Sequence, residues 1–200
     1  MYRRLFSIFI IFLIVLGCSK KDELSVKPPD ENEAYQIYKE GLDAMNNGDF
    51  FFAAKKFSEA EKILPVIEQS AKALLMNGFC YYSINFHDEA IASLENFLRK
   101  YPADKNVQYA SYLIALSNYE QILDEKRDLK PLLTSKKIIK EYIKKYPETD
   151  YALDLKFKLD LIQNQLAAKE IYVAKYYIKT QKWIPTINRL KVVIKDYEET

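Results

Sequence analysis

Cys18 is the residue whose type and position point most directly to chemistry. It closely follows an apolar run, Leu5 to Leu16, which itself follows the basic pair Arg3-Arg4. The run is too short to cross a bilayer, which takes about 20 apolar residues. It suits the apolar region of an export signal instead. The sequence therefore predicts a signal peptide over residues 1–17.

The four residues Val15-Leu16-Gly17-Cys18 are similar to a bacterial lipobox, in which a peptidase cuts just before a cysteine that carries lipid. Gly17 is the small residue that such a cut needs. We expect an N-acyl group and an S-diacylglycerol thioether on Cys18, because several acyl chains anchor a protein that one chain holds only marginally. Ser19 then favours sorting to the periplasmic face of the outer membrane. The alternative is an ordinary secretory signal, or a short membrane anchor, with a chance cysteine.

No other group of residues in the sequence indicates catalysis. The chain has one histidine, His87, which we interpret as a solvated turn residue. The sequence has no metal-ligand spacing, glycine-rich phosphate loop or nucleophile elbow. Cys80 lies in an apolar stretch and is interpreted as a small buried thiol. We predict that the protein is not an enzyme and has no catalytic residue, no metal and no cofactor apart from the covalent lipid.

The remaining composition favours a helical protein on a tether. Without residues 1–17 the chain carries equal numbers of basic and acidic side chains, so nothing favours nucleic acid as a partner. Residues 18–32 are polar and contain Pro28-Pro29, which is typical of a flexible linker. Only 4 of the 200 residues are glycine. Residues 33–200 are therefore predicted to form helices.

The helical part contains an internal repeat. Gly41 and Pro65 are 24 residues apart, as are Gly78 and Pro102, and the offset between the two pairs is 37 residues. Each proline marks the end of a helix, because proline cannot continue one. The pattern resembles the tetratricopeptide repeat. It predicts an all-α superhelical, right-handed solenoid of about four helix pairs, with units at about 33–65, 66–102, 103–147 and 148–200.

The later units are less regular. The third has a long turn, Leu123 to Pro131, before a second helix that starts at Thr134. The fourth has a long first helix, Tyr151 to Lys179, and a second helix from Ile184 to Tyr197. A solenoid normally ends in a polar cap. Because the last residues make only a thin cap, we expect a further carboxyl-terminal repeat after Thr200.

In tetratricopeptide arrays the first helix of each pair lines a concave groove. Twelve positions of the first three units are predicted to face it, and seven of them are aromatic: Tyr35, Tyr38, Phe79, Tyr82, Tyr109, Tyr112 and Tyr119. Aromatic side chains anchor interfaces because they combine a large contact area with a low entropy cost. The groove therefore suits an extended or helical peptide. Alternatively, many of these rings pack against neighbouring helices.

The whole arrangement resembles the BamD family, the tetratricopeptide lipoproteins of the outer-membrane β-barrel assembly machinery. The most specific part is residues 166–200, which contain Val173-Ala174, Tyr176-Tyr177, Trp183 and Asn188-Arg189. Residues 126–128 and 146–152 are also similar to the family. The family usually has a fifth repeat, before which this chain ends.

This resemblance implies a function without catalysis. The protein would be a scaffold that holds the periplasmic domains of BamA, works beside other assembly lipoproteins, and binds unfolded outer-membrane proteins in its groove. Trp183, Asn188 and Arg189 are the implied BamA contacts, although Arg189 is equally interpreted as a capping or intramolecular salt-bridge residue.

Two other functions remain open at this point. Another periplasmic tetratricopeptide lipoprotein, for pilus assembly or envelope coordination, would share the anchor and the solenoid. An enzyme that carries helical repeats would need a catalytic domain after Thr200.

Overall fold

A computed structural model describes residues 31–122 and 129–197. The predictions for Cys18, the signal peptide, most of the tether, residues 126–128 and the end of the chain lie outside the described residues. Within the described ranges there are eight α-helices. They are α2 (Glu31–Asn46), α3 (Phe50–Ile63), α4 (Ile67–Ser83), α5 (His87–Lys100), α6 (Val107–Glu120), α7 (Lys130–Lys145), α8 (Asp150–Lys179) and α9 (Trp183–Asp196).

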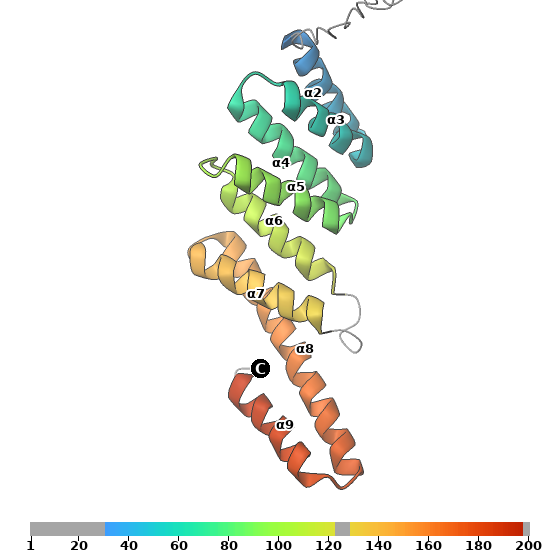
Figure 1. Ribbon diagram of the computed structural model, residues 1–200, viewed down its shortest axis with the longest axis vertical. Helices are drawn as coiled ribbons and strands as arrows, with labels where there is room; N and C mark the ends of the chain where they lie inside the picture. The colour runs from blue at the N-terminus through green and yellow to red at the C-terminus, as the bar shows by residue number, and fades with distance from the viewer. Residues whose placement is uncertain (1–30, 123–128, 198–200) are drawn as a thin grey trace, which may run out of the picture.

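The helices form four antiparallel pairs that stack along the long axis of the molecule (Figure 1). Each helix packs against the next one in the chain, within a pair and between pairs alike. The predicted all-α fold of helix pairs is confirmed. Helix pairs of this kind bury their apolar faces by stacking on neighbouring pairs, because two helices alone cannot cover those faces.

Side chains at the turns set where several helices begin. The Asp49 carboxylate accepts a hydrogen bond from the amide of Phe52 at 3.1 Å and caps α3, and the Thr149 hydroxyl accepts one from the amide of Ala152 at 3.1 Å and caps α8. Each satisfies a donor that the first helical turn leaves unpaired. Gly48 precedes the first of these caps with φ +82°, a conformation that glycine adopts without strain.

The helices of a pair approach closely at the two glycines that mark the repeat. A Cβ atom on Gly41 would lie 3.0 Å from the ring of Phe57, and one on Gly78 would lie 2.6 Å from Cγ of Leu94. Phe57 and Leu94 are fully buried second-helix residues at matching places in the repeat. The repeat spacing therefore reflects a physical contact, in which a large side chain of the second helix fills the space beside a glycine of the first.

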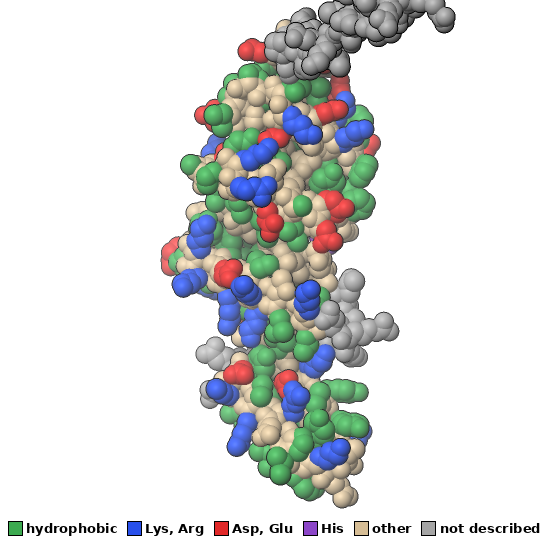
Figure 2. Space-filling model, viewed as in Figure 1, with side chains coloured by type: hydrophobic (Ala, Val, Ile, Leu, Met, Phe, Trp, Pro, Cys, Tyr) green, Lys and Arg blue, Asp and Glu red, His purple; other side chains and the backbone are tan. Residues whose placement is uncertain are grey.

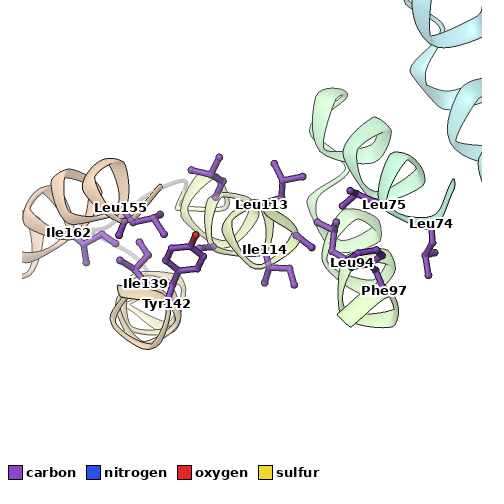
Figure 3. Packing of buried hydrophobic residues seen from close by; sticks show 14 of the residues in the cluster. Leu74, Leu75, Leu94, Phe97, Leu113, Ile114, Ile139, Tyr142, Leu155 and Ile162 are labelled. Atoms are coloured by element: carbon purple, nitrogen blue, oxygen red, sulfur yellow. The ribbon is translucent and has the colours of Figure 1, made fainter. Parts of the chain in front are cut away.

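The largest core cluster runs through the second, third and fourth pairs (Figure 3). Leu94 and Phe97 from α5 lie next to α6, whose Leu113 and Ile114 continue the row. Further members come from α7 and α8, namely Ile139, Tyr142, Leu155 and Ile162. One apolar core therefore crosses the boundaries of the units, and it fixes how successive first helices lie against one another.

Several helix boundaries differ from the predicted ones. Helix α2 begins at Glu31, two residues before the predicted start of the folded part, and acidic residues in its first turn suit the positive end of the helix dipole. Helix α7 begins at Lys130 and not at Thr134, because Pro131 is tolerated in a first turn, where its missing N–H needs no partner. Helix α9 begins at Trp183 and not at Ile184.

Candidate functional site

The first helices of the later pairs make a common wall. Helix α6 contacts both α4 and α8, although α5 and α7 separate these helices in the sequence. This is the arrangement that the groove prediction requires. The side chains that α4, α6 and α8 share at this wall are the candidate site.

Tyrosine rings from α6, α7 and α8 form a cluster on this wall, in which Tyr112 and Tyr151 stack and the other pairs of rings are tilted. Tyr112 lies at its centre, with its ring centroid 4.6 Å from that of Tyr151 and 6.4 Å from that of Tyr142. The ring of Tyr109 is 5.8 Å from Tyr151. Burial raises the pKa of Tyr109 above its usual value. Contacts at these distances stabilise aromatic pairs beyond the area that they bury.

Polar contacts hold the cluster in place. The Tyr112 hydroxyl donates to Oδ2 of Asp154 at 2.9 Å, and Nζ of Lys158 lies 3.3 Å from Oδ1 of the same carboxylate. That ammonium also lies 5.3 Å from the centroid of the Tyr119 ring. Burial, and then the bond to Asp154, raise the pKa of Tyr112, which keeps its hydroxyl protonated as a donor. Tyr112, Tyr119 and α8 are therefore linked through one carboxylate.

Tyr82 extends the wall toward the second pair. Its ring is half-buried and lies 6.2 Å from that of His87, centroid to centroid. Burial, followed by the nearby carboxylates of Glu120 and Asp154, raises the pKa of Tyr82. The interpretation of His87 as a solvated turn residue is wrong. It is the first residue of α5, its ring is half-buried against Tyr82, and its Nδ1 is buried without a hydrogen-bond partner.

Three other predicted groove residues, on α2 and α4, are placed differently. Tyr35 is exposed on α2. Tyr38 packs edge-on against Phe57, with 5.4 Å between the ring centroids, and Phe79 lies 6.5 Å from Phe50 in the same way. The predicted groove residues therefore fall into two groups along the chain. Tyr38 and Phe79 contribute to packing within and between the first two pairs, whereas Tyr82 and the residues of α6 belong to the wall.

The fourth pair carries the other predicted contacts. Trp183 is 60% exposed, and Asn188 is exposed on the same helix. One guanidinium nitrogen of Arg189 donates to both carboxylate oxygens of Glu170, at 3.2 and 3.0 Å. The intramolecular salt bridge that we considered for Arg189 is thus present, and it ties α9 to α8. Figure 2 shows hydrophobic side chains at the surface of this end of the molecule.

Sequence reasoning missed Tyr151 and Asp154, which complete the wall. The predicted fourth unit treats this long helix as the partner of α9 alone, and it therefore describes only the part of α8 that packs against α9. Because α8 is 30 residues long, its first turns serve the third pair and its last turns the fourth. The sequence shows Tyr151 near the start of this helix. Its periodicity does not indicate which neighbouring helix the first turns contact.

A cavity of about 690 Å³ was also missed. It lies between the α4–α5 turn and the carboxyl end of α6 and is lined by residues 85–89, Glu120 and Gln121. Nε2 of Gln121 donates to Oδ1 of Asp88 at 3.1 Å across it. A cavity formed by residues more than 30 positions apart leaves no pattern in the sequence.

The described residues offer little chemistry beyond binding. Among them, no group of three or more His, Cys, Asp or Glu side chains could hold a metal ion. Cys80 is buried, and burial raises the pKa of its thiol to about 12, so it stays protonated and is a poor nucleophile. No helix in the described ranges is long and apolar enough to cross a membrane.

Comparison with known proteins places the chain in a family. The model of the YfiO family, described as outer membrane lipoprotein, matches residues 30–200. The chain belongs to this family of outer membrane lipoproteins. Among curated members, the outer membrane protein assembly factor BamD of Caulobacter vibrioides is 32% identical over 186 residues, which are 93% of this chain and 61% of the relative. The BamD of Rickettsia prowazekii is 32% identical over 195 residues, which are 97% of this chain and 76% of the relative.

A relative of lower identity, the outer membrane protein assembly factor BamD of Neisseria gonorrhoeae, is 28% identical over 175 residues, or 82% of this chain and 66% of the relative. The predicted resemblance to the BamD family is therefore confirmed. The chain spans about three fifths of the length of the Caulobacter relative.

Proposed function

We propose that this lipoprotein is a non-enzymatic scaffold in the assembly of outer-membrane β-barrel proteins. The main structural support is the row of half-buried aromatic rings along α4, α6 and α8, which offers a preformed surface for another polypeptide. The family relatives carry the name of outer membrane protein assembly factors. A scaffold needs surfaces and no catalytic centre, which agrees with the chemistry of the described residues.

The wall suits client segments that are rich in aromatic side chains. Tyr82, Tyr109 and Tyr119 are each partly exposed beside the central ring of Tyr112. Their rings are already held by neighbours, so binding immobilises few rotatable bonds and loses little entropy. The clients would be unfolded outer-membrane proteins, whose carboxyl-terminal segments end in an aromatic residue.

The fourth pair is the proposed contact for the periplasmic domains of BamA, in a complex that also holds other assembly lipoproteins. Exposed Trp183 and Asn188 would make direct contact. Arg189 would keep α9 oriented through Glu170 and present its remaining guanidinium donors, because its side chain is still 44% exposed. Tryptophan and arginine are frequent centres of binding energy at interfaces.

The amino terminus would carry the anchor. Lipid on Cys18 would hold the protein at the periplasmic face of the outer membrane. Mass spectrometry of the purified mature protein should find a diacylglycerol thioether and an N-acyl group on Cys18. An unmodified amino terminus on a protein that is not membrane-bound would contradict this part of the proposal.

Site-specific photo-crosslinking in living cells tests the two surfaces separately. A photoreactive residue at Tyr82 should crosslink to outer-membrane proteins during their assembly, and one at Trp183 should crosslink to BamA. The matched control is Glu95, an exposed residue of second helix α5, which should give neither product. The scaffold function is wrong if BamA does not co-purify from detergent-solubilised membranes and neither test position yields its product.

A further inference from the structure

We propose that an exposed face of α8 is a contact through which two copies of this chain pair antiparallel, each copy meeting the same face of the other. This inference goes beyond the proposed function, because it concerns neither the aromatic wall nor the residues assigned to BamA. The face carries five large apolar side chains that are 37–76% exposed: Leu153, Phe157, Leu161, Tyr172 and Tyr176. We call these five residues, together with the exposed Ala168, the α8 strip.

The α8 strip lies along one side of a single long helix, which runs from the third pair to the fourth (Figure 1). Its members follow one another at steps of four, four, seven, four and four residues. Such steps return to the same side of a helix with 3.6 residues per turn. The buried residues Leu155, Ile162 and Ala174 lie on other sides of α8, where it packs against α6, α7 and α9. The strip is therefore an apolar face, about 35 Å long at 1.5 Å per residue, that the described residues leave exposed.

The order of the steps in the α8 strip is the same in both directions, as a twofold contact requires. The centre of the strip lies between Asn164 and Gln165. An antiparallel pairing about this centre makes three kinds of contact, each of which forms twice in an isologous dimer. They are Leu153 with the partner's Tyr176, Phe157 with the partner's Tyr172, and Leu161 with the partner's Ala168. The two central amides of each copy can hydrogen-bond across the axis, and polar residues inside an apolar helix contact fix its register.

A hollow in the second half of the α8 strip suits this partner. It has a volume of about 340 Å³ and is lined by Tyr172, Lys175, Tyr176, Ile178 and Lys179. In the antiparallel register, it lies level with the partner's Leu153 and Phe157. Side chains of one helix pack into the spaces between side chains of the facing helix. The first half of the strip therefore supplies the apolar side chains, and the second half supplies the space that receives them.

The charges at the two ends of the α8 strip are complementary to a second copy. Asp150 is exposed in the first turn of α8, and Lys179 is exposed in its last turn. Each suits the dipole of its own helix. The two residues also lie at mirrored positions about the centre of the strip. An antiparallel pairing therefore brings each charge toward its opposite, whereas a parallel pairing would bring like charges together.

The exposed area is large enough for a pair. With about 200 Å² for a large side chain, the α8 strip exposes on the order of 600 Å² in each copy. Two copies together offer on the order of 1,200 Å², which exceeds the ~1,000 Å² that a specific contact needs. A different protein could cover the same area, but it would gain nothing from the mirrored order of the residues. A second copy uses that order in full.

Disulfide cross-linking of the full-length protein in membranes tests the pairing. Asn164→Cys places a thiol beside the twofold axis, where the two copies of this position face each other. The buried Cys80 does not compete for oxidation. Mild oxidation should convert most of the Asn164→Cys protein into a covalent dimer. The matched control Lys191→Cys, at an exposed position of α9, should stay mostly monomeric. Equal yields from the two variants, or no dimer from either, would overturn the proposal.

A mixture of two variants tests the direction of the pairing. Asp150→Cys and Lys179→Cys should give a mixed dimer when both proteins are present in one membrane. Neither variant alone should give a dimer, because antiparallel pairing separates the two copies of either position by about 40 Å along the helix. Dimers from each variant alone, without the mixed product, would mean a parallel contact and would overturn the antiparallel one.

A charge introduced into the α8 strip should break the pair. Phe157→Glu should reduce the dimer yield of Asn164→Cys by about tenfold or more, because two buried rings are lost from one contact. The thermal midpoint should stay the same, since Phe157 is 64% exposed. The matched control Lys156→Glu changes an exposed neighbour outside the strip and should keep the dimer. An unchanged yield with Phe157→Glu would contradict the contact. In cells, a photoreactive residue at Phe157 that captures only a different protein would assign the strip to that partner and overturn the pairing of two copies.

Discussion

At the scale of single residues, the two glycines of the first helices are sites where the fold leaves little room for a side chain. Gly41 and Gly78 occupy the same place in two successive repeats. Their surroundings differ in how far they can yield, because a Cβ atom at Gly41 would touch the edge of the Phe57 ring, whereas one at Gly78 would overlap the branch point of Leu94. Leu94 is fully buried, so it cannot move aside without displacing its own neighbours.

We predict that Gly78→Ala destabilises the protein although alanine is the better helix former. The helix gains about 1 kcal/mol from the substitution. The overlap in a packed core costs about 1–3 kcal/mol and should exceed that gain. Thermal unfolding followed by circular dichroism measures the difference. Gly41→Ala is the matched control and should change the midpoint less. A Gly78→Ala protein with an unchanged or higher midpoint would contradict the packing described for Leu94.

Several tyrosines make the protein sensitive to alkali. Burial, and then the hydrogen bond to Glu61, raise the pKa of Tyr101 to about 12, and burial also raises the pKa values of Tyr82, Tyr142 and Tyr197. The unfolded chain would ionise them near pH ~10. Their stabilising effect is therefore complete below the unfolded value and is lost as the pH rises through the folded one.

We predict that the midpoint of thermal unfolding falls steadily between about pH 10 and pH 12, in step with the difference between the folded and unfolded pKa values. Tyr101→Phe should make the fall less steep, because one of the linked groups is gone. Tyr35→Phe, at an exposed position, should leave the slope as it is. Calorimetry combined with phenolate absorbance measures both. A flat profile over this range would show that the tyrosines ionise without affecting folding.

At the scale of elements, one buried carboxylate joins the first pair to the second. Glu61 on α3 accepts hydrogen bonds from Nζ of Lys100 and from the hydroxyl of Tyr101, both at 2.9 Å. The Glu61 side chain is 7% exposed, whereas that of Lys100 is 46% exposed. Desolvation therefore costs free energy mainly at Glu61, because its carboxylate is largely removed from water whereas the ammonium of Lys100 is not.

We predict that Lys100→Ala destabilises the contact between α3 and α5 by about 1–3 kcal/mol, because it leaves a buried charge with one donor fewer. Adding Glu61→Gln should restore part of that loss, since the amide is neutral and can still accept from Tyr101. A double-mutant cycle on denaturant unfolding measures the coupling. Lys137→Ala, in an exposed pair on α7, is the control and should have little effect. Additive effects of the two substitutions would show that the pair is not coupled.

At the scale of the whole molecule, the helix pairs form a chain of nearest neighbours. The fourth pair illustrates this best, because α9 packs mainly against α8, and a contact between Lys136 of α7 and the Tyr197 ring, 4.9 Å from its centroid, joins only its last residues to the third pair. Stability in such a stack is approximately the sum of each unit and its interfaces. The α8–α9 end can therefore open without disturbing the α4–α5 pair, which has neighbours on both sides.

We predict that Ala174→Leu opens only this end of the molecule. Ala174 is 1% exposed where α8 meets α9, so three added carbon atoms cannot be accommodated. Hydrogen exchange of the α9 amides should become roughly tenfold faster or more, while that of α4 and α5 stays the same. Ala168→Leu, at an exposed position of the same helix, is the control. Equal acceleration along the whole chain would mean that the protein unfolds as one cooperative unit.

Much of the fold could be predicted because its strongest contacts are local. The spacing from Gly41 to Pro65, repeated from Gly78 to Pro102, located two helix pairs, and the long α8 was placed to within one residue. The family resemblance was equally visible. The client and BamA contacts remain predictions, and the lipid on Cys18 lies outside the described residues.

The candidate site was harder to predict. Seven aromatic residues were correctly assigned to first helices, but the sequence did not say which of them would stack, which would pack into the first two pairs, or that Arg189 would pair with Glu170. Tyr112 and Asp154 are 42 positions apart, and Glu61 and Tyr101 are 40 apart. Partners at such separations depend on how neighbouring helices cross.

The sequence by itself determined the helix pairs and the apolar face of each helix, because both follow from the 3.6-residue period and from where glycine and proline stand. Only the tertiary structure decided that α8 reaches back to α6, that Tyr151 and Asp154 complete the tyrosine wall, and that an acidic cavity opens beside His87. The reason is physical. Periodicity fixes the direction of a side chain relative to its own helix axis, whereas contacts between helices also depend on their lengths and crossing angles.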